Sequence, residues 1–116
     1  MKLLIVEDNP TVRRMMKNIV GRLAEEIHEC GDGGEALAAY LAHRPDFVLM
    51  DIAMGAVDGI AATRQIRAAD PAAQVIVVTN YDEADLREAA RQAGACGYVL
   101  KENLFDVRRL LQTAAE

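Results

Sequence analysis

Acidic side chains stand directly after two short apolar runs of the chain. Glu7 and Asp8 follow the apolar residues 3–6, and Asp51 follows the apolar residues 47–50. Runs of this length are typical of strands buried on both faces of a parallel sheet, and such sheets place their chemistry at the carboxyl ends of the strands. We therefore expect the three carboxylates to meet in one cleft.

Three neighbouring carboxylates favour a divalent cation, because each negative charge raises the pKa of the others. Hard oxygen ligands suit Mg2+ or Mn2+, and Mg2+ commonly binds one or two carboxylates together with a phosphate. A carboxylate such as Asp51 can also act as a nucleophile and form an aspartyl phosphate. Thr79 and Lys101 follow two further apolar runs. They would help to position and neutralise the phosphoryl oxygens at the same edge.

The elements that must position these residues alternate regularly along the chain. Apolar runs and turn residues predict strands over 3–6, 25–30, 46–50, 75–78 and 97–100. Helical spacing and caps predict helices over 10–24, 35–42, from Asp58 to the residue before Pro71, over 82–93 with Gly94 as C-cap, and from Asn103 onward, where Leu104, Val107, Leu110 and Leu111 would be buried. This alternation predicts an α/β, flavodoxin-like, doubly wound (βα)5 sandwich with a parallel sheet of order 2-1-3-4-5.

Length and composition limit the classes of function. The 116 residues predict one domain over 1–116, with no second domain. The net charge of -5 argues against nucleic-acid binding through a broad basic surface. We see neither a signal peptide nor a run that could span a bilayer, so we expect a cytoplasmic protein. Cys30 and Cys96 would lie at opposite edges of the sheet as free thiols.

The whole chain resembles the receiver domains of two-component response regulators. The resemblance rests on five pieces in the right order: residues 5–9, Asp51, Met54 with residues 58–59, residues 78–79 and residues 97–101. It implies that Asp51 accepts a phosphoryl group from a sensor histidine kinase or a phosphotransfer protein. The chain would then be a switch rather than an enzyme, with at most self-catalysed phosphorylation and slow autodephosphorylation.

The resemblance also assigns roles to single residues. Asp8, Asp51 and the backbone carbonyl of Ala53 would bind Mg2+ or Mn2+ directly, and Glu7 would assist through water. Lys101 would pair with the phosphoryl group, and Thr79 would hydrogen-bond it.

A switch relay is implied as well. Thr79 would move toward the phosphoryl group and leave space into which Tyr98 turns. The output surface would comprise the helix over 82–93, the strand over 97–100 and the last helix, and a homodimer could form there or through the first and last helices. Ala53 and Tyr81 would set the lifetime of the phosphorylated form. Glu102 stands where many receivers carry Pro, so we expect no cis peptide there.

Residues 94–101 are most similar to receivers of the nitrate-type subfamily, which carry a LuxR-like DNA-binding output domain. The chain would then control transcription through a separate or missing DNA-binding domain.

Two other classes of function remain open from the sequence. One is a stand-alone or degenerate receiver that acts only as a protein-interaction module. The other, a metal-dependent phosphohydrolase, lacks a dedicated general acid or base. Several other polar residues have simpler interpretations: Asp58 as a helix cap, His28 and His43 as exposed side chains, residues 31–34 as a turn, and Arg13, Arg14, Lys17, Arg108 and Arg109 as solvated helix faces.

Overall fold

The computed structural model describes residues 1–52 and 58–115. Its strands are β1 (Lys2–Val6), β2 (Glu26–Cys30), β3 (Phe47–Met50), β4 (Val75–Thr79) and β5 (Gly97–Leu100). Its helices are α1 (Pro10–Val20), α2 (Ala36–His43), α3 (Gly59–Ala69), α4 (Ala84–Ala93) and α5 (Phe105–Ala115), with short 3-10 helices at Gly33–Glu35 and Lys101–Asn103. The strands form one parallel sheet of order β2-β1-β3-β4-β5, which confirms the predicted flavodoxin-like topology.

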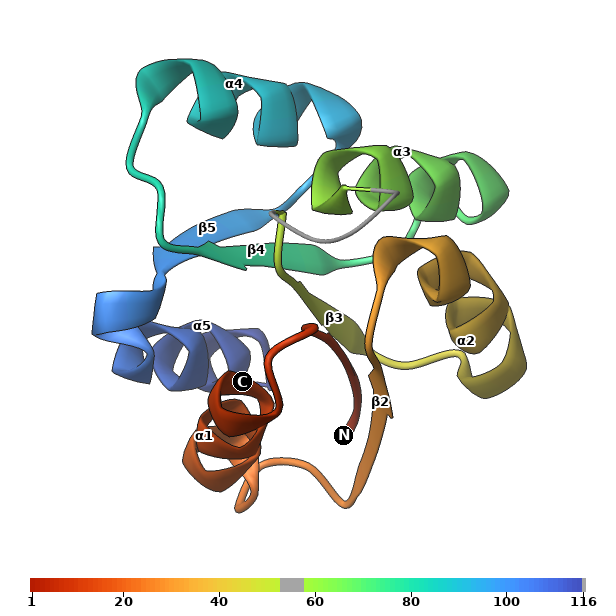
Figure 1. Cartoon of the computed structure of the whole chain (residues 1–116). Coiled ribbons are helices and arrows are strands. Elements are labelled where there is room, and N and C mark those ends of the chain that lie inside the picture. Colours follow the sequence, from red (N-terminus) through yellow and green to blue (C-terminus); the bar gives the residue numbers. More distant parts are fainter. Residues whose placement is uncertain (53–57, 116) are drawn as a thin grey trace.

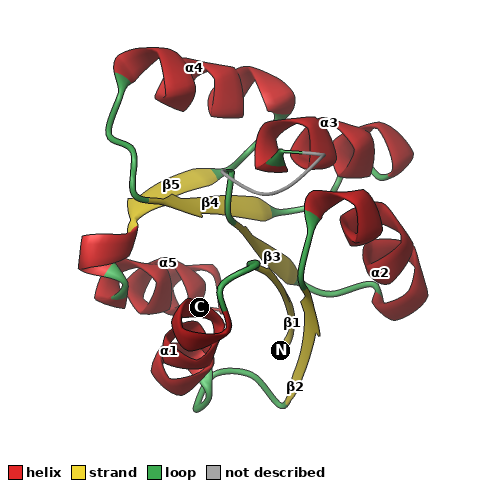
Figure 2. Cartoon of the chain, in the orientation of Figure 1, coloured by secondary structure: helices red, strands yellow, loops and turns green. Residues whose placement is uncertain are grey.

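Helices cover both faces of this sheet (Figure 1). Figure 2, which is coloured by secondary structure, shows α1 and α5 on one side of the sheet and α2, α3 and α4 on the other. Side chains of a strand alternate between faces. In β1, Leu3 and Ile5 therefore join the core under α1 and α5, whereas Leu4 and Val6 join the core under α2 and α3. Burial on both faces explains why the central strands read as continuous apolar runs.

Local caps determine where several helices begin and end. The Asn9 side-chain oxygen accepts the N–H groups of Thr11 and Val12 at 2.9 and 3.2 Å, so α1 starts immediately after the acidic loop. Asp58 caps α3 through the N–H of Ala61 at 2.8 Å, as predicted. Gly94 ends α4 with a φ of 104°, which confirms the predicted left-handed C-cap.

The two ends of the predicted helical pattern differ from the structure. The first helix stops at Val20 rather than at residue 24, and beyond it the N–H of Leu23 makes the tighter i to i−3 bond to the Val20 carbonyl at 2.9 Å. The last helix begins at Phe105, since the residues expected to include its cap form a 3-10 helix instead. Leu110 is 39% exposed, so its predicted burial was wrong.

Other residues outside the site test the remaining predictions. Cys30 and Cys96 are free thiols, as expected. His28 and His43 are not exposed: both are half-buried, and their rings stack with centroids 3.5 Å apart. Within residues 1–52 and 58–115 there is no cis peptide bond. In the same part of the chain, no helix is long and apolar enough to cross a lipid bilayer.

Candidate phosphoacceptor and metal site

The register of the central strands brings the predicted acids together. β1 and β3 are neighbours with Val6 opposite Met50, so Glu7 and Asp51 leave the sheet side by side. The Asp51 N–H donates to the Val6 carbonyl at 3.0 Å and thereby extends the pairing by one residue. Carboxylate oxygens of Glu7, Asp8 and Asp51 all lie within 4.8 Å of one another. The predicted acidic cluster is present.

Lys101 is the cation closest to the buried acids among the described residues. It follows β5, and its Nζ lies 3.0 Å from Glu7 Oε2 and 3.3 Å from Asp51 Oδ2. Burial raises the pKa of the Glu7 carboxyl, and the Asp51 charge adds to this effect against the lowering influence of Lys101. Burial lowers the pKa of Lys101, but the contacts with Glu7 and Asp51 outweigh it and raise this pKa. The ammonium group therefore stays charged.

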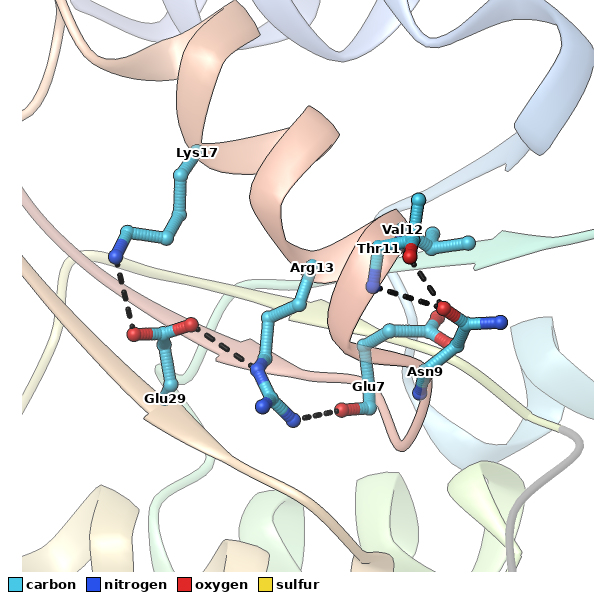
Figure 3. A network of polar contacts seen from close by, with 7 residues as sticks. All are labelled: Glu7, Asn9, Thr11, Val12, Arg13, Lys17 and Glu29. Carbon is cyan, nitrogen blue, oxygen red and sulfur yellow. Dashed lines mark hydrogen bonds and ion pairs between the residues drawn. The ribbon is translucent and has the colours of Figure 1, made fainter.

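The loop that carries Asp8 is held from both sides. Asp8 is exposed, whereas Glu7 is fully buried. The Asn9 N–H donates to Glu7 Oε1 at 3.2 Å, and the Asn9 side chain caps α1 (Figure 3). The exposed carboxylate is therefore presented by a loop whose two flanking residues are fixed.

Thr79 lies at the end of β4, fully buried and in register with Leu100. Its Oγ1 accepts the N–H of Tyr81 at 3.2 Å, and the Tyr98 hydroxyl donates to the Tyr81 carbonyl at 2.6 Å. The guanidinium of Arg87 lies over the Tyr98 ring, with its central carbon 4.6 Å from the ring centroid. The Tyr81 side chain is 47% exposed. The two predicted switch residues, Thr79 and Tyr98, are thus connected through the main chain of Tyr81, the residue predicted to set the lifetime of the phosphorylated form.

Gly59 sets how closely α3 approaches Asp51. A Cβ at this position would lie 2.0 Å from the Asp51 carbonyl oxygen and 2.7 Å from its carbonyl carbon, both backbone atoms. Only a residue without a side chain fits there. The start of α3 is therefore packed directly against the backbone of the candidate phosphoacceptor.

The donor set fits a small hard cation. All the side-chain ligands are carboxylate oxygens, which suit Mg2+ or Mn2+. Glu7 Oε2 is buried without a well-aligned hydrogen bond, although Lys101 Nζ lies nearby, so it could still accept from a metal-bound water. The Ala53 carbonyl, predicted as a further ligand, and the neighbouring Met54 lie outside the described residues.

Sequence reasoning missed one contact of this site. Arg13 was interpreted as part of a solvated helix face, but its Nη1 donates to the Glu7 carbonyl at 2.8 Å. Its position gives the signal that could have found it: Arg13 stands one helical turn after the cap Asn9, and helical side chains lean back toward the N-terminus. Thr79, Lys101 and the three acids, by contrast, lie where the strand ends predicted them.

The fold and this site together define a class of protein: a doubly wound α/β domain with an acidic cleft at the ends of its two central strands. The family model of the response regulator receiver domain matches residues 3–115. The chain therefore belongs to the response regulator receiver domain family.

Individual relatives agree with this assignment. The chemotaxis protein CheY of Halobacterium salinarum is 35% identical over 100 residues, which cover 86% of this chain and 83% of that protein. Regulatory protein AtoC of Escherichia coli is 34% identical over 116 residues, which cover 99% of this chain but only 25% of AtoC. A LuxR-family two-component response regulator from Aurantimonas superposes with a TM-score of 0.85 at 31% identity, covering 97% of this chain and 85% of that one.

Proposed function

We propose that this chain is a phosphorylation-dependent switch in a two-component phosphorelay, with Asp51 as the Mg2+-dependent phosphoacceptor. The observation that carries this proposal is the cluster of Glu7, Asp8 and Asp51 within 4.8 Å, with Lys101 in contact with two of its members. The donor would be a sensor histidine kinase or a phosphotransfer protein, and the cytoplasm is the expected location.

In the proposed step, an Asp51 carboxylate oxygen attacks the phosphorus atom of the donor. A P–O bond to Asp51 forms as the bond between phosphorus and the donor's leaving group breaks. The leaving group departs with the electron pair of that bond, and a histidine imidazole then takes up a proton from water. Asp8 and Asp51 would hold Mg2+ directly, with Glu7 assisting through water, and the cation would supply neutralisation of charge on the transferred phosphoryl oxygens. Lys101 would shift from the carboxylates to pair with a phosphoryl oxygen. The Thr79 hydroxyl would donate to another oxygen.

The response of Thr79 would pass to Tyr98. If Thr79 moves toward the phosphoryl group, its hydroxyl gives up the bond from the Tyr81 N–H, and the Tyr81 carbonyl is the acceptor of the Tyr98 hydroxyl. Tyr98 would then turn inward and alter the surface of α4, β5 and α5. Moving such an equilibrium from mostly inactive to mostly active takes about 5 kcal/mol of differential stabilisation. Charge-assisted hydrogen bonds to a buried phosphoryl group are strong enough to contribute at this scale.

The output is proposed to be transcriptional. The similarity of residues 94–101 to nitrate-type receivers and the likeness to a LuxR-family regulator support this subfamily. DNA contact would come from an output domain rather than from this acidic chain. A homodimer would use the surface of α4, β5 and α5, or that of α1 and α5.

Incubation with Mg2+ and acetyl phosphate tests the function. We expect one acid-stable, base-labile phosphoryl group per chain, seen as a mass increase, and its loss in Asp51→Asn. Asp58→Asn is the matched control, because Asn also caps helices and this residue lies outside the acidic cluster. Steady release of phosphate without a labelled protein would indicate a phosphohydrolase. Neither labelling nor turnover would indicate a degenerate interaction module.

The lifetime of the aspartyl phosphate is a separate part of this proposal. Tyr81 would slow the access of water to the phosphoryl group, and Ala53 offers no side-chain amide to assist hydrolysis. We expect Tyr81→Ala and Ala53→Asn to change the decay rate measured after removal of the donor. Unchanged lifetimes in both variants would contradict this role while leaving the labelling of Asp51 intact.

A further inference from the structure

Arg13 connects three elements beside the acidic loop (Figure 3). From α1, its Nη1 donates to the carbonyl of Glu7 at the end of β1, at 2.8 Å. Its Nε donates to Glu29 Oε1 on the edge strand β2, at 3.0 Å. The other oxygen of Glu29 lies 3.2 Å from Lys17 Nζ. Arg13 is 24% exposed and Glu29 34% exposed, so both side chains are partly shielded from water.

The hydrogen bond from Arg13 to the Glu7 carbonyl lies just beyond the end of the pairing between β1 and β2. β1 and β2 pair up to Val6 and Cys30, and the Glu7 N–H adds one more bond to the Cys30 carbonyl at 3.1 Å. A longer β2 would supply the next backbone N–H to the Glu7 carbonyl. Arg13 supplies that donor instead. It therefore fixes the direction in which the main chain leaves the sheet toward Asp8.

The same residue reaches the far side of the loop through its main chain. The Arg13 N–H donates to the Asn9 carbonyl at 2.9 Å, and the Asn9 N–H donates to Glu7 Oε1 at 3.2 Å. Asp8 thus stands between Glu7 and Asn9, each of which is bonded to Arg13. Among residues 1–52 and 58–115, no hydrogen bond or ion pair holds the Asp8 side chain, and this residue is exposed.

We propose that Arg13, oriented by Glu29, is a positioning residue for the carboxylates of Glu7 and Asp8 toward Mg2+. This inference rests on the proposed function. Mg2+ demands near-ideal octahedral geometry, so a ligand loop that turns by a small angle loses affinity for it. The planar guanidinium suits this task because Nε and Nη1 point in fixed directions, one to Glu29 and one to Glu7, whereas a lysine offers one point charge.

The test compares Arg13→Ala, Arg13→Lys and Glu29→Ala in the whole chain. Mg2+ affinity is measured by isothermal titration calorimetry, and the rate of labelling by acetyl phosphate is measured as a function of Mg2+ concentration. Partners that orient metal ligands typically change metal affinity about 10-fold or more when removed. We expect Arg13→Ala to raise the half-saturating Mg2+ concentration by about 10-fold. The labelling rate at saturating Mg2+ should stay near that of the wild type.

The conservative and double variants separate positioning from mere support of the fold. Arg13→Lys should bind Mg2+ little better than Arg13→Ala does, because a lysine cannot bond the Glu7 carbonyl and Glu29 in the fixed directions of the guanidinium. Glu29→Ala should weaken Mg2+ binding by less than Arg13→Ala does, and the double variant should be no weaker than Arg13→Ala alone, because Glu29 acts through Arg13. Lys17→Ala is the matched control: it removes the other partner of Glu29 and leaves both bonds of Arg13 in place.

Each outcome is informative. Wild-type Mg2+ affinity in Arg13→Ala, with or without a lower melting temperature of the metal-free protein, would overturn the positioning role. A double variant much weaker than Arg13→Ala would overturn the part assigned to Glu29. If the wild-type chain is not labelled at Asp51 at any Mg2+ concentration, the proposed function fails instead. The calorimetric Mg2+ affinities would still decide the role of Arg13 in that case.

Discussion

The two ends of the parallel sheet handle charge in opposite ways. At the carboxyl ends of the strands, Glu7 and Lys101 form an ion pair whose side chains are 0% and 14% exposed. At the amino ends, Glu26 and Lys2 form an ion pair whose side chains are 48% and 37% exposed. Burial raises the pKa of Glu7, whereas hydrogen bonds from His28 and Lys2 lower the pKa of Glu26. A Glu–Lys pair therefore carries a desolvation cost at the carboxyl ends of the strands, whereas the pair at the amino ends stays largely hydrated.

This difference separates charged pairs that cost the fold little from charged groups whose burial the fold must offset. An exposed pair costs little to make and contributes little to stability. A buried pair of acids with one lysine is held at a cost that the surrounding fold must offset. The residues at the carboxyl ends should therefore respond to substitution in ways that their counterparts at the amino ends do not.

Adding one methyl group at each end should give the largest contrast. Gly59→Ala places a Cβ against the Asp51 backbone, which cannot yield as a side chain can. We expect a loss of about 3 kcal/mol in the free energy of unfolding, measured by urea denaturation, together with a loss of Asp51 labelling.

Gly97→Ala is the counterpart at the amino end of β5. Its Cβ would meet the Leu110 Cδ1 at 3.3 Å and the Ile76 side chain at 3.5 Å, and the flexible end of Leu110 can shift. We expect a much smaller loss of stability and normal labelling. Equal losses in the two variants would mean that the site end is no more tightly packed than the other.

Removing the lysine from each pair is the second contrast. Lys101→Met removes the ammonium group that Glu7 and Asp51 share, and we expect the free energy of unfolding at pH 7 without Mg2+ to fall by about 2 kcal/mol. Lys2→Met, at the exposed pair, should change it little. Urea denaturation in the presence of a metal chelator gives both values. Mg2+ should restore part of the loss in Lys101→Met, since the cation replaces the missing positive charge.

Much of this asymmetry could be predicted from the sequence. Apolar runs that end in Glu7, Asp51, Thr79 or Lys101 predict both the parallel sheet and the edge at which polar groups gather. The order 2-1-3-4-5 followed from the alternation of strands and helices together with the doubly wound pattern. Strand ends are predictable because a strand buried on both faces is a continuous apolar run, and the first polar residue marks where that run ends.

Contacts made by long side chains were less predictable. Arg13 and His28 lie on amphipathic elements, where the sequence pattern indicates only that a residue is outside the core. Their partners come from other elements, which local spacing does not identify. Leu110 was expected in the core because helical spacing cannot distinguish the buried stripe from its margin, and Leu111 takes the buried position. Such details depend on the angle at which a helix lies on the sheet, which local periodicity does not encode.

Two tyrosine hydroxyls extend the comparison to hydrogen bonds. Toward the amino ends, Tyr40 donates to the Asp70 carboxylate at 2.6 Å, and near the carboxyl ends Tyr98 donates to the Tyr81 carbonyl at the same distance. A bond to a charged acceptor is roughly twice as strong as a neutral one. We expect Tyr40→Phe to lower the free energy of unfolding at least twice as much as Tyr98→Phe, which should instead alter the response of β5 to phosphorylation.

Alkaline pH gives an independent check on Tyr40. Burial and the Asp70 carboxylate raise the pKa of Tyr40 from 10.0 to about 12. The stability that this shift contributes is complete below pH 10 and is lost as pH rises toward the folded-state pKa. The difference in unfolding free energy between the wild type and Tyr40→Phe should shrink over that range. A difference that stays constant with pH would show that Asp70 does not hold the phenol in its protonated form.

The smallest effect, and the one with the clearest sign, comes from the two glutamates. The pKa of Glu7 is raised above 4.5 in the folded chain, so the stability that this shift contributes is present below pH 4.5 and is lost as pH rises through the folded-state pKa. The pKa of Glu26 is lowered, so the stability it contributes is present above pH 4.5 and is lost as pH falls through its folded-state value. Without Mg2+, Glu7→Gln should therefore gain stability relative to the wild type as pH rises, and Glu26→Gln should lose it. Urea denaturation of the three proteins across the acid-to-neutral range measures both slopes. Slopes of the same sign would mean that burial, the cause assigned to the shift of Glu7, does not distinguish the two ends of the sheet.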